Sequence, residues 1–286
     1  MSVVSTRTIK AAGLHSPCLD TGGEASEAVV FVHGNPGSSE DWRALVTEVG
    51  PFARAVAADM PGFGQADKPR DFNYTVLGYA QHLAALLAEL QITRAHLVLH
   101  DFGGPWGLAW AAQNPTQVAS VTLFNIGILP GYTWHYLARI WRTPLLGELF
   151  QLAASRAGFH LLMKHGNPRG LPREFVDRMF DNYDAGTKRA ILKLYRATNP
   201  TDVAAFSAQV TAALKPRDLP ALVIWGERDP YLPSRYAEVQ REVFPRAKVV
   251  KLADSGHFAF ADNPTAVAAE VIPFLREQLN QGACRT

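Results

Sequence analysis

Four polar side chains stand directly after apolar runs of strand length, where a chain entering a protein core rarely carries polar groups. They are Asn35, Asp101, Asp229 and His257. An ionised carboxylate that is buried without a partner is costly. Asp101 is therefore either a cap for the helix that follows it or a residue that takes part in chemistry. A carboxylate is already charged at neutral pH, so Asp101 is able to act as a nucleophile without first losing a proton.

The apolar runs alternate with segments of helical pattern. They cover residues 28–34, 54–59, 96–101, 118–125, 221–227 and 247–254. Their content of Val, Leu, Ile and Phe predicts buried parallel strands. The alternation indicates an α/β protein in which helices cover both faces of a mostly parallel sheet. Because parallel strands end at one edge of a sheet, we expect the four polar residues to meet there, at the edge where open α/β sheets bind ligands.

Two helices have clear patterns, and the first 20 residues predict one or two leading strands. Residues 75–91 carry apolar side chains at intervals of three and four, with Thr75 as a predicted N-cap. A second helix spans 265–279, and we expect Pro273 to kink it.

The alternation stops between about Leu129 and Pro216, where Trp, Tyr, Leu and Arg recur at helical spacing. We therefore expect an α/β core made of residues 1–128 and 217–286, and a helical cap inserted at 129–216 over the ligand-binding edge.

The composition excludes several classes of function. The 286 residues suit one large core with a subdomain, and the net charge of +2 comes without any run of like charges, so we expect no nucleic-acid or membrane partner. No apolar stretch reaches transmembrane length and the N-terminus does not resemble a signal peptide, which predicts a cytoplasmic protein. Cys18 and Cys284 have no metal-type spacing, and a disulfide between them has no support. Monomer and homodimer both remain open.

Four motifs resemble those of the α/β-hydrolase family: "HGNPGSS" (33–39), "DMPGFGQADKP" (59–69), "HDFGG" (100–104), and "WGERDP" (225–230) followed by "GH" (256–257). The resemblance implies a nucleophile on a tight turn between strand and helix, then an acid, then a histidine. Asp101, Asp229 and His257 match these positions in that order. Gly103 would let the helix pack closely, while Leu99, often a small residue in the family, would make the turn more open.

An aspartate in the nucleophile position changes the expected chemistry. Attack by Asp101 on a saturated carbon makes an alkyl ester of the enzyme, which water must then hydrolyse. His257 would take the proton from that water while Asp229 fixes its tautomer. The resemblance narrows to the branch that contains epoxide hydrolases and haloalkane dehalogenases, and implies an oxyanion hole formed by the backbone N–H groups of Asn35 and Phe102, with no cofactor and no metal.

Two reactions compete for this site. Haloalkane dehalogenases of this branch hold the departing halide with N–H donors, typically a Trp after the nucleophile, where this chain has Phe102. Trp134 or Trp141 could replace that donor. Epoxide hydrolases use cap tyrosines, and "ILKLYRATNP" (191–200) resembles their motif, which makes Tyr195 the candidate acid.

A second cap tyrosine is not identified. Tyr132, Tyr136 and Tyr183 are available, while Leu149 falls near the expected place. The sequence thus favours an epoxide hydrolase that takes a small apolar epoxide and water to a diol. Haloalkane dehalogenation is the alternative, and ester hydrolysis or ligand binding without catalysis ranks below both.

Each of these residues also has a purely structural interpretation. Asp101 could cap the next helix, Asp229 could be a turn residue before Pro230, and Tyr195 could be packing. His257 could be a helix-entry histidine, and Asn35 a turn former. Asn125 occupies the other place where relatives carry the acid, but an amide cannot hold a negative charge beside an imidazolium.

Overall fold

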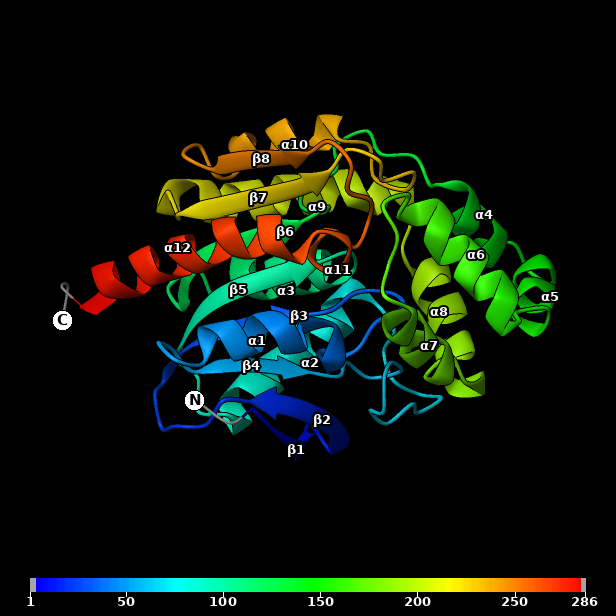
Figure 1. Ribbon diagram of the computed structural model, residues 1–286, viewed down its shortest axis with the longest axis horizontal. Helices are drawn as coiled ribbons and strands as arrows, with labels where there is room; N and C mark the ends of the chain where they lie inside the picture. The colour runs from blue at the N-terminus through cyan, green and yellow to red at the C-terminus, as the bar shows by residue number, and fades with distance from the viewer. Residues whose placement is uncertain (1–3, 284–286) are drawn as a thin grey trace.

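The computed structural model describes residues 4–283, in which one sheet runs through the centre and a block of helices stands beyond one end of it (Figure 1). The strands are β1 Ser5–Ala11, β2 Leu14–Asp20, β3 Glu27–Val32, β4 Ala55–Ala58, β5 Arg94–His100, β6 Val118–Phe124, β7 Ala221–Gly226 and β8 Lys248–Leu252. Their order in the sheet is β1-β2-β4-β3-β5-β6-β7-β8. The first two strands run antiparallel to their neighbours, and β4, β3, β5, β6, β7 and β8 pair in parallel.

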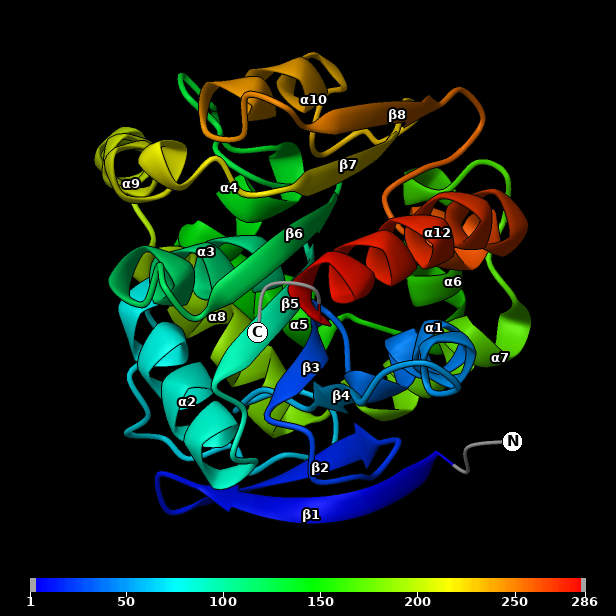
Figure 2. The ribbon, with the colours of Figure 1, turned by 90° about the vertical axis from the view of Figure 1, so that its left-hand side faces the viewer.

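Twelve α-helices in the described residues cover the faces of the sheet or form the insertion. They are α1 Arg43–Val49, α2 Val76–Glu89, α3 Gly103–Gln113, α4 Tyr136–Arg142, α5 Leu146–Leu152, α6 Arg156–Gly166, α7 Arg173–Asp181, α8 Ala185–Ala197, α9 Pro200–Leu214, α10 Arg235–Val239, α11 Ala259–Asp262 and α12 Pro264–Ala283. Figure 2 shows α2 and α3 on one side of the sheet and α1 and α12 on the other. The α/β class and the mostly parallel sheet predicted from the sequence are confirmed.

The central strands are buried on both faces, which explains their continuous apolar sequences. All of β6 and β7, and all of β5 after Arg94, is buried. Such strands have no polar face to alternate with an apolar one, as expected for a parallel sheet covered twice. The strands that follow the helical insertion, β7 and β8, continue the same parallel sheet.

The predicted helix boundaries also agree. Thr75 caps α2, because its hydroxyl accepts a hydrogen bond from the Gly78 N–H at 3.1 Å. Helix α12 contains Pro273 in its interior, and the kink expected at this residue stays a prediction. Cys18 is buried as a free thiol, and Cys284 lies outside the described residues. Among residues 4–283, no helix is long and apolar enough to cross a membrane.

The insertion is helical throughout, from α4 to α9. Figure 1 shows α4 to α8 gathered beyond the carboxyl ends of the strands, whereas α9 lies beside the sheet. Helix α9 packs against α3, so the last helix of the insertion touches the core directly. Helices α4 to α8 therefore cover the edge of the sheet at which the polar residues were expected (Figure 1).

Candidate active site

Asp101 lies at a sharp turn between β5 and α3. Its φ is +48°, a left-handed conformation that a non-glycine residue adopts only when its surroundings hold it there. Glycines make this turn possible. A Cβ on Gly103 would lie 2.3 Å from the Val32 carbonyl oxygen, and one on Gly34 would lie 2.3 Å from the Asp101 Cβ. The side chain of Asp101 is not used to cap α3, since its Oδ1 accepts from the Asn35 N–H at 2.7 Å.

Leu99 does not open the turn as expected. Its side chain is fully buried, and a Cβ on Gly107 would lie 2.4 Å from one of its methyl groups. The larger residue in β5 is accommodated by a glycine in the facing turn of α3. The strand and the helix therefore remain close together.

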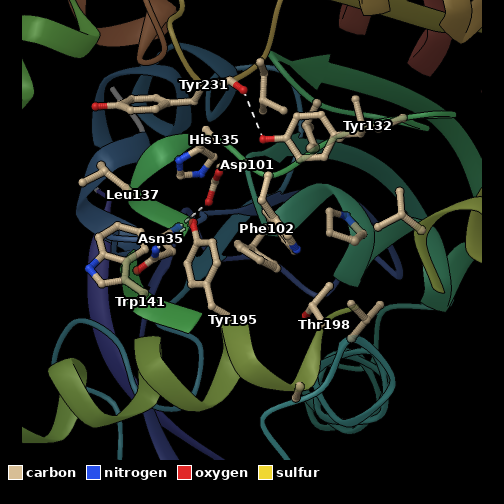
Figure 3. Close-up of a pocket in the computed structure, with 18 of the residues that line it drawn as sticks. Asn35, Asp101, Phe102, Tyr132, His135, Leu137, Trp141, Tyr195, Thr198 and Tyr231 are labelled. Carbon is tan, nitrogen blue, oxygen red and sulfur yellow. Dashed lines mark hydrogen bonds between the residues drawn. The ribbon is translucent and has the colours of Figure 1, made fainter. Parts of the chain in front are cut away.

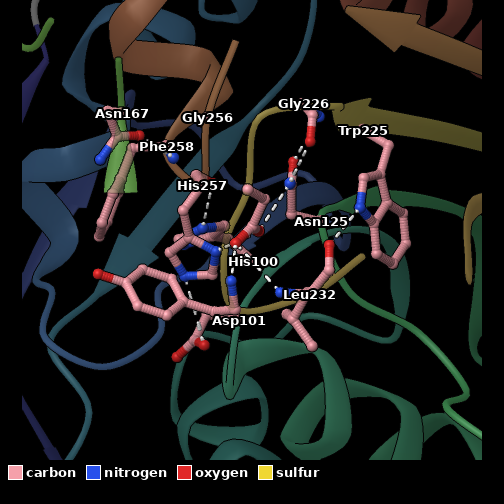
Figure 4. Close-up of polar contacts among 12 residues, drawn as sticks. His100, Asp101, Asn125, Asn167, Trp225, Gly226, Leu232, Gly256, His257 and Phe258 are labelled. Atoms are coloured by element: carbon pink, nitrogen blue, oxygen red, sulfur yellow. Dashed lines mark hydrogen bonds and ion pairs between the residues drawn. The ribbon is translucent and has the colours of Figure 1, made fainter. Parts of the chain in front are cut away.

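His257 lies between two carboxylates (Figure 4). Its Nδ1 is 2.7 Å from Asp229 Oδ2, and its Nε2 is 3.5 Å from Asp101 Oδ2. All three side chains are nearly inaccessible to solvent. The arrangement brings together residues 101, 229 and 257 as expected from the sequence, with His257 positioned to exchange a proton on the side of Asp101.

Asp229 is held by four hydrogen bonds. Its Oδ1 accepts from the N–H groups of Tyr231 and Leu232, at 2.7 and 3.1 Å. Its Oδ2 accepts from Asn125 Nδ2 at 2.8 Å in addition to the contact with His257. Asn125, considered above only as an alternative place for the acid, thus supports the acid at 229. Glu227 is exposed and takes no part.

The charges of these groups stabilise one another. Burial opposes ionisation of both Asp101 and His257, but their mutual attraction outweighs it. The hydrogen bond and charge of His257 lower the pKa of Asp101 to about 2. The carboxylates of Asp229 and Asp101 raise the pKa of His257 to about 10. Both shifts favour an ionised Asp101 beside a protonated His257.

Two further histidines surround the site in structural roles. His33 accepts from the Met60 N–H at 2.9 Å, and its other nitrogen lies 2.9 Å from the Gly34 carbonyl. His100 Nε2 lies 2.9 Å from the carbonyl oxygen of His257. Burial lowers the pKa of His100 to about 3, so it stays neutral and positions the loop that carries His257.

The oxyanion hole is predicted from the backbone N–H groups of Asn35 and Phe102. The Asn35 N–H already donates to Asp101 Oδ1. The Phe102 N–H makes no hydrogen bond to Asp101 among the described residues, and its contribution remains a prediction. The ring of Phe102 lines the cavity and meets the ring of Tyr195 edge to face at 5.0 Å.

Tyr195 extends from α8 toward the nucleophile. Figure 3 shows its hydroxyl beside Asn35 and Asp101. The oxygen accepts from Asn35 Nδ2 at 3.4 Å, which leaves the phenolic hydrogen free to donate. Burial and the negative charge of Asp101 raise the pKa of Tyr195 far above its usual value, so it remains a neutral donor.

His135, which sequence reasoning missed, provides another donor. It is the N-cap of α4, and its Nδ1 accepts from the Ala138 N–H at 3.2 Å. Nδ1 therefore carries no hydrogen in the neutral ring, and the hydrogen is on Nε2. Burial lowers the pKa of His135 to about 4 and keeps the ring neutral. His135 lines the cavity and lies beside Asp101 in Figure 3.

The other aromatic candidates differ in whether their hydrogen already has an acceptor. Tyr132 lines the cavity, but its hydroxyl donates to the Tyr231 carbonyl at 3.1 Å. The indole N–H groups of Trp134 and Trp141 are buried with no partner among the described residues, and both rings pack against Tyr195. The remaining candidates lie elsewhere: Tyr183 on the far wall, Tyr136 and Leu149 largely at the surface.

The cavity in front of Asp101 has a volume of about 570 Å³ and is lined mainly by apolar and aromatic side chains. Asp101, His257, Asn35, Tyr195 and His135 are the polar groups that converge on it next to the nucleophile. No group of three or more His, Cys, Asp or Glu side chains in the described chain could hold a metal ion. The site can thus bind an apolar molecule and present one carboxylate and several neutral donors to it.

The sequence of this chain is similar to a known family and to characterised proteins. Residues 27–264 match the family model described as "alpha/beta hydrolase fold". A haloalkane dehalogenase of Mesorhizobium japonicum is 27% identical over 273 residues, which cover 89% of this chain and 86% of the relative. A cis-3-alkyl-4-alkyloxetan-2-one decarboxylase of Xanthomonas campestris pv. campestris is 28% identical over 282 residues, with 92% and 93% covered.

A solved structure of a haloalkane dehalogenase is also similar to this chain. The crystal structure of the haloalkane dehalogenase DbeA from Bradyrhizobium elkani USDA94 matches with a TM-score of 0.84 at 26% identity, and covers 98% of this chain and 100% of its own. None of these three relatives is described as an epoxide hydrolase. Two of the three are haloalkane dehalogenases, so the comparisons support the alternative reaction, halide displacement, better than the ring opening that the sequence motifs favoured.

Proposed function

The chain belongs to the α/β-hydrolase family, and from that premise we propose that it is a haloalkane dehalogenase, with Asp101 as the nucleophile. The observation that carries the proposal is a buried, ionised Asp101 facing an apolar cavity beside three neutral donors, those of Asn35, Tyr195 and His135. The overall reaction consumes one water and yields an alcohol, a halide ion and a proton.

In the first step, an Asp101 oxygen attacks the carbon that carries the halogen. A carbon–oxygen bond forms, the carbon–halogen bond breaks, and the halide leaves with the electron pair. The product is an ester between Asp101 and the alkyl group. The left-handed turn exposes the carboxylate at the end of β5 with its second oxygen held by the Asn35 N–H, so the attack requires little reorganisation.

The second step is hydrolysis of that ester, and the first step prepares it. Once Asp101 is esterified, it no longer carries the charge that helps to raise the pKa of His257. The pKa of His257 then falls, and the imidazole can take a proton from the attacking water. Asp229 keeps the His257 hydrogen on Nδ1 and stabilises the imidazolium that forms.

The departing halide needs hydrogen-bond donors, and an indole is one way to supply them. Asn35 Nδ2, the Tyr195 hydroxyl and His135 Nε2 are neutral donors around the carbon that Asp101 would attack. Neutral donors stabilise a halide ion without forming a permanent ion pair with Asp101. These three groups would therefore replace the donor that is missing at Phe102.

Epoxide hydrolysis is the second candidate, favoured by the same Tyr195 hydroxyl and by the phenyl ring at position 102. In that reaction Asp101 attacks an oxirane carbon, and Tyr195 gives its proton to the ring oxygen as the ring opens. A halide ion needs no proton on leaving. The dependence on the Tyr195 proton therefore separates the two reactions.

The covalent step is tested with a His257→Gln variant, which can form the ester but cannot activate water. Incubation with 1-bromobutane should add the mass of one butyl group, in place of one hydrogen, to the intact protein, and peptide mapping should place it on Asp101. The Asp101→Asn variant is the control and should stay unmodified. Full release of bromide by the His257→Gln variant without any adduct would contradict the mechanism.

The choice between reactions is tested with Tyr195→Phe on 1-bromobutane and 1,2-epoxybutane. For a dehalogenase, the wild type releases bromide, and loss of one donor of three lowers kcat by about fivefold. For an epoxide hydrolase, the diol is the main product, and loss of the acid lowers kcat by about 100-fold or more. Diol formation by the wild type with no bromide release would replace the first candidate by the second.

A further inference from the structure

The cavity in front of Asp101 has two parts of different character. On one side, the buried side chains of Trp141, Phe159, Met163 and Tyr183 close it off, each no more than 8% exposed. We call this part the inner chamber. In Figure 3, Trp141 and Leu137 lie on one side of Tyr195, and Phe102 and Thr198 lie on the other. The cavity therefore extends past the nucleophile in two directions.

The second part runs between two helices. It is lined by Pro105, Ala109 and Gln113 of α3 and by Val203, Phe206 and Gln209 of α9. We call it the outer groove. The three residues of α3 are spaced by four, and those of α9 by three, so each set occupies one face of its helix. From Pro105 to Gln113, α3 rises about 12 Å.

The lining of the outer groove is mainly apolar, with three exposed polar side chains, those of Asp202, Gln113 and Gln209. Pro105, Ala109, Val203 and Phe206 line its walls, and the glutamines at 113 and 209 are exposed at its rim. Near the opening stands Leu77 of α2, whose side chain is 49% exposed. Apolar side chains of this kind favour the binding of a flexible hydrocarbon chain, because the chain is removed from water when it lies against them.

The two parts differ in what they could accommodate. Figure 2 shows α2, α3 and α9 on one side of the molecule, and α6 and α7 on the opposite side. The inner chamber is lined by buried side chains of α4 and α6, which limit the size of a group placed there. The outer groove is open at its end and sets no such limit. A substrate with its reactive carbon near one end fits this asymmetry.

Resting on the function proposed above, we propose that the substrates are long, unbranched alkyl halides whose tail lies in the outer groove between α3 and α9. The carbon that carries the halogen meets Asp101, the halogen faces Tyr195 and His135, and the hydrocarbon tail passes Phe102 and Ala109 toward Leu77. The groove thus selects substrates by chain length, while Asp101 and its donors carry out the reaction.

The first test is a series of 1-bromoalkanes from propyl to decyl, with kcat/KM measured from bromide release. Each methylene that enters the groove should raise kcat/KM by about two- to fourfold. The rise should stop once the tail reaches the opening. A kcat/KM that does not change, or that falls, with chain length would overturn the proposal, even if bromide is released from the short members.

A matched pair of variants tests the place of the tail. Ala204 and Ala205 are neighbours on α9 and both are exposed, but only Ala205 lines the cavity. Ala205→Trp should lower kcat/KM for 1-bromodecane by about tenfold or more relative to kcat/KM for 1-bromopropane, since several methylenes of the longer chain lose their place. Ala204→Trp should resemble the wild type on both substrates. Equal effects of the two variants would contradict the assignment.

A binding experiment separates this proposal from the proposed reaction. Calorimetry with 1-decanol and the Asp101→Asn variant requires no turnover. Binding that is tighter than that of 1-butanol, and that Ala205→Trp weakens on the same background, supports the groove even if no bromoalkane is converted. Turnover of 1-bromopropane together with equal affinity for both alcohols supports the reaction and rejects the groove.

Discussion

At the scale of single residues, the site depends on a histidine between two carboxylates. Asp101 and Asp229 both approach His257, but their surroundings differ. Asp229 accepts bonds from two backbone N–H groups and from Asn125, so its oxygens are fully used. Asp101 keeps an oxygen toward the cavity. The same residue type thus serves as a fixed support in one place and as a nucleophile in the other.

Asp229→Asn should slow ester hydrolysis by about 1,000- to 10,000-fold, because an amide neither fixes the tautomer of His257 nor stabilises its charge. Formation of the ester should be affected less, so the alkylated enzyme should accumulate during turnover. Rapid quenching followed by intact-mass measurement of the protein checks both parts. A variant that loses esterification and hydrolysis to the same extent would indicate that Asp229 acts mainly on folding.

Asn125 offers an internal rescue for this variant. Its Nδ2 lies 2.8 Å from Asp229 Oδ2, the oxygen that contacts His257. A carboxylate introduced by Asn125→Asp would therefore lie near His257 Nδ1. In the double variant with Asp229→Asn, part of the lost hydrolysis rate should return. Stopped-flow measurement of the decay of the ester compares the double variant with the single variants.

At the scale of elements, local structure sets the direction of the reacting groups. The turn between β5 and α3 holds Asp101 at positive φ because Gly34 and Gly103 remove the side chains that would block it. Helix α4 begins at His135, whose ring caps the helix through Nδ1 and also lines the cavity. The capping bond thereby determines which nitrogen of His135 is able to donate.

Substitutions at His135 separate its two roles. His135→Asn retains a side chain that can cap α4, so its free energy of unfolding should stay close to that of the wild type. His135→Ala should lose about 1 kcal/mol from the missing cap. Both variants should release bromide more slowly, because both lack the Nε2–H donor. Chemical denaturation measures the first effect and steady-state kinetics the second; unchanged kinetics in both would remove His135 from the site.

At the scale of the whole molecule, the cap and the core enclose a charged cluster in an apolar interior. Polar contacts join the two parts at their edge, such as Lys68 Nζ to Asp184 Oδ2 at 2.7 Å and Gln65 Nε2 to Asn182 Oδ1 at 2.5 Å. Exposed pairs of this type contribute little stability. The buried contacts between His257 and its two carboxylates therefore have a larger effect on how stability changes with pH.

His257 should make the stability of the protein decrease in alkaline solution. Its pKa is about 10 in the folded protein and about 6.5 in the unfolded chain. The stabilisation is thus complete below about pH 6.5 and disappears as the pH rises through about 10. The difference in unfolding free energy between the wild type and His257→Gln should shrink over this range by a few kcal/mol, on the order set by the pKa shift. Urea denaturation at pH 6 and at pH 9.5 measures it.

The sequence by itself predicted the sheet, the turn at Asp101, and Asp229 and His257 as the partners of Asp101. These features depend on patterns that are local in the chain: apolar runs of strand length, capping residues, and the glycines that follow Asp101. Parallel strands that end at one edge bring such residues together whatever the details of packing. The pattern therefore predicted the neighbours of Asp101 from opposite ends of the chain.

Only the tertiary structure decided the surroundings of that carboxylate. His135 precedes a short helix in a region with weak periodicity, and nothing in its neighbours along the chain indicates which ring nitrogen faces the cavity. The supporting role of Asn125 and the groove between α3 and α9 likewise depend on how helices and strands distant in sequence pack together. Helix packing is set by contacts between many side chains at once, and no single motif encodes it.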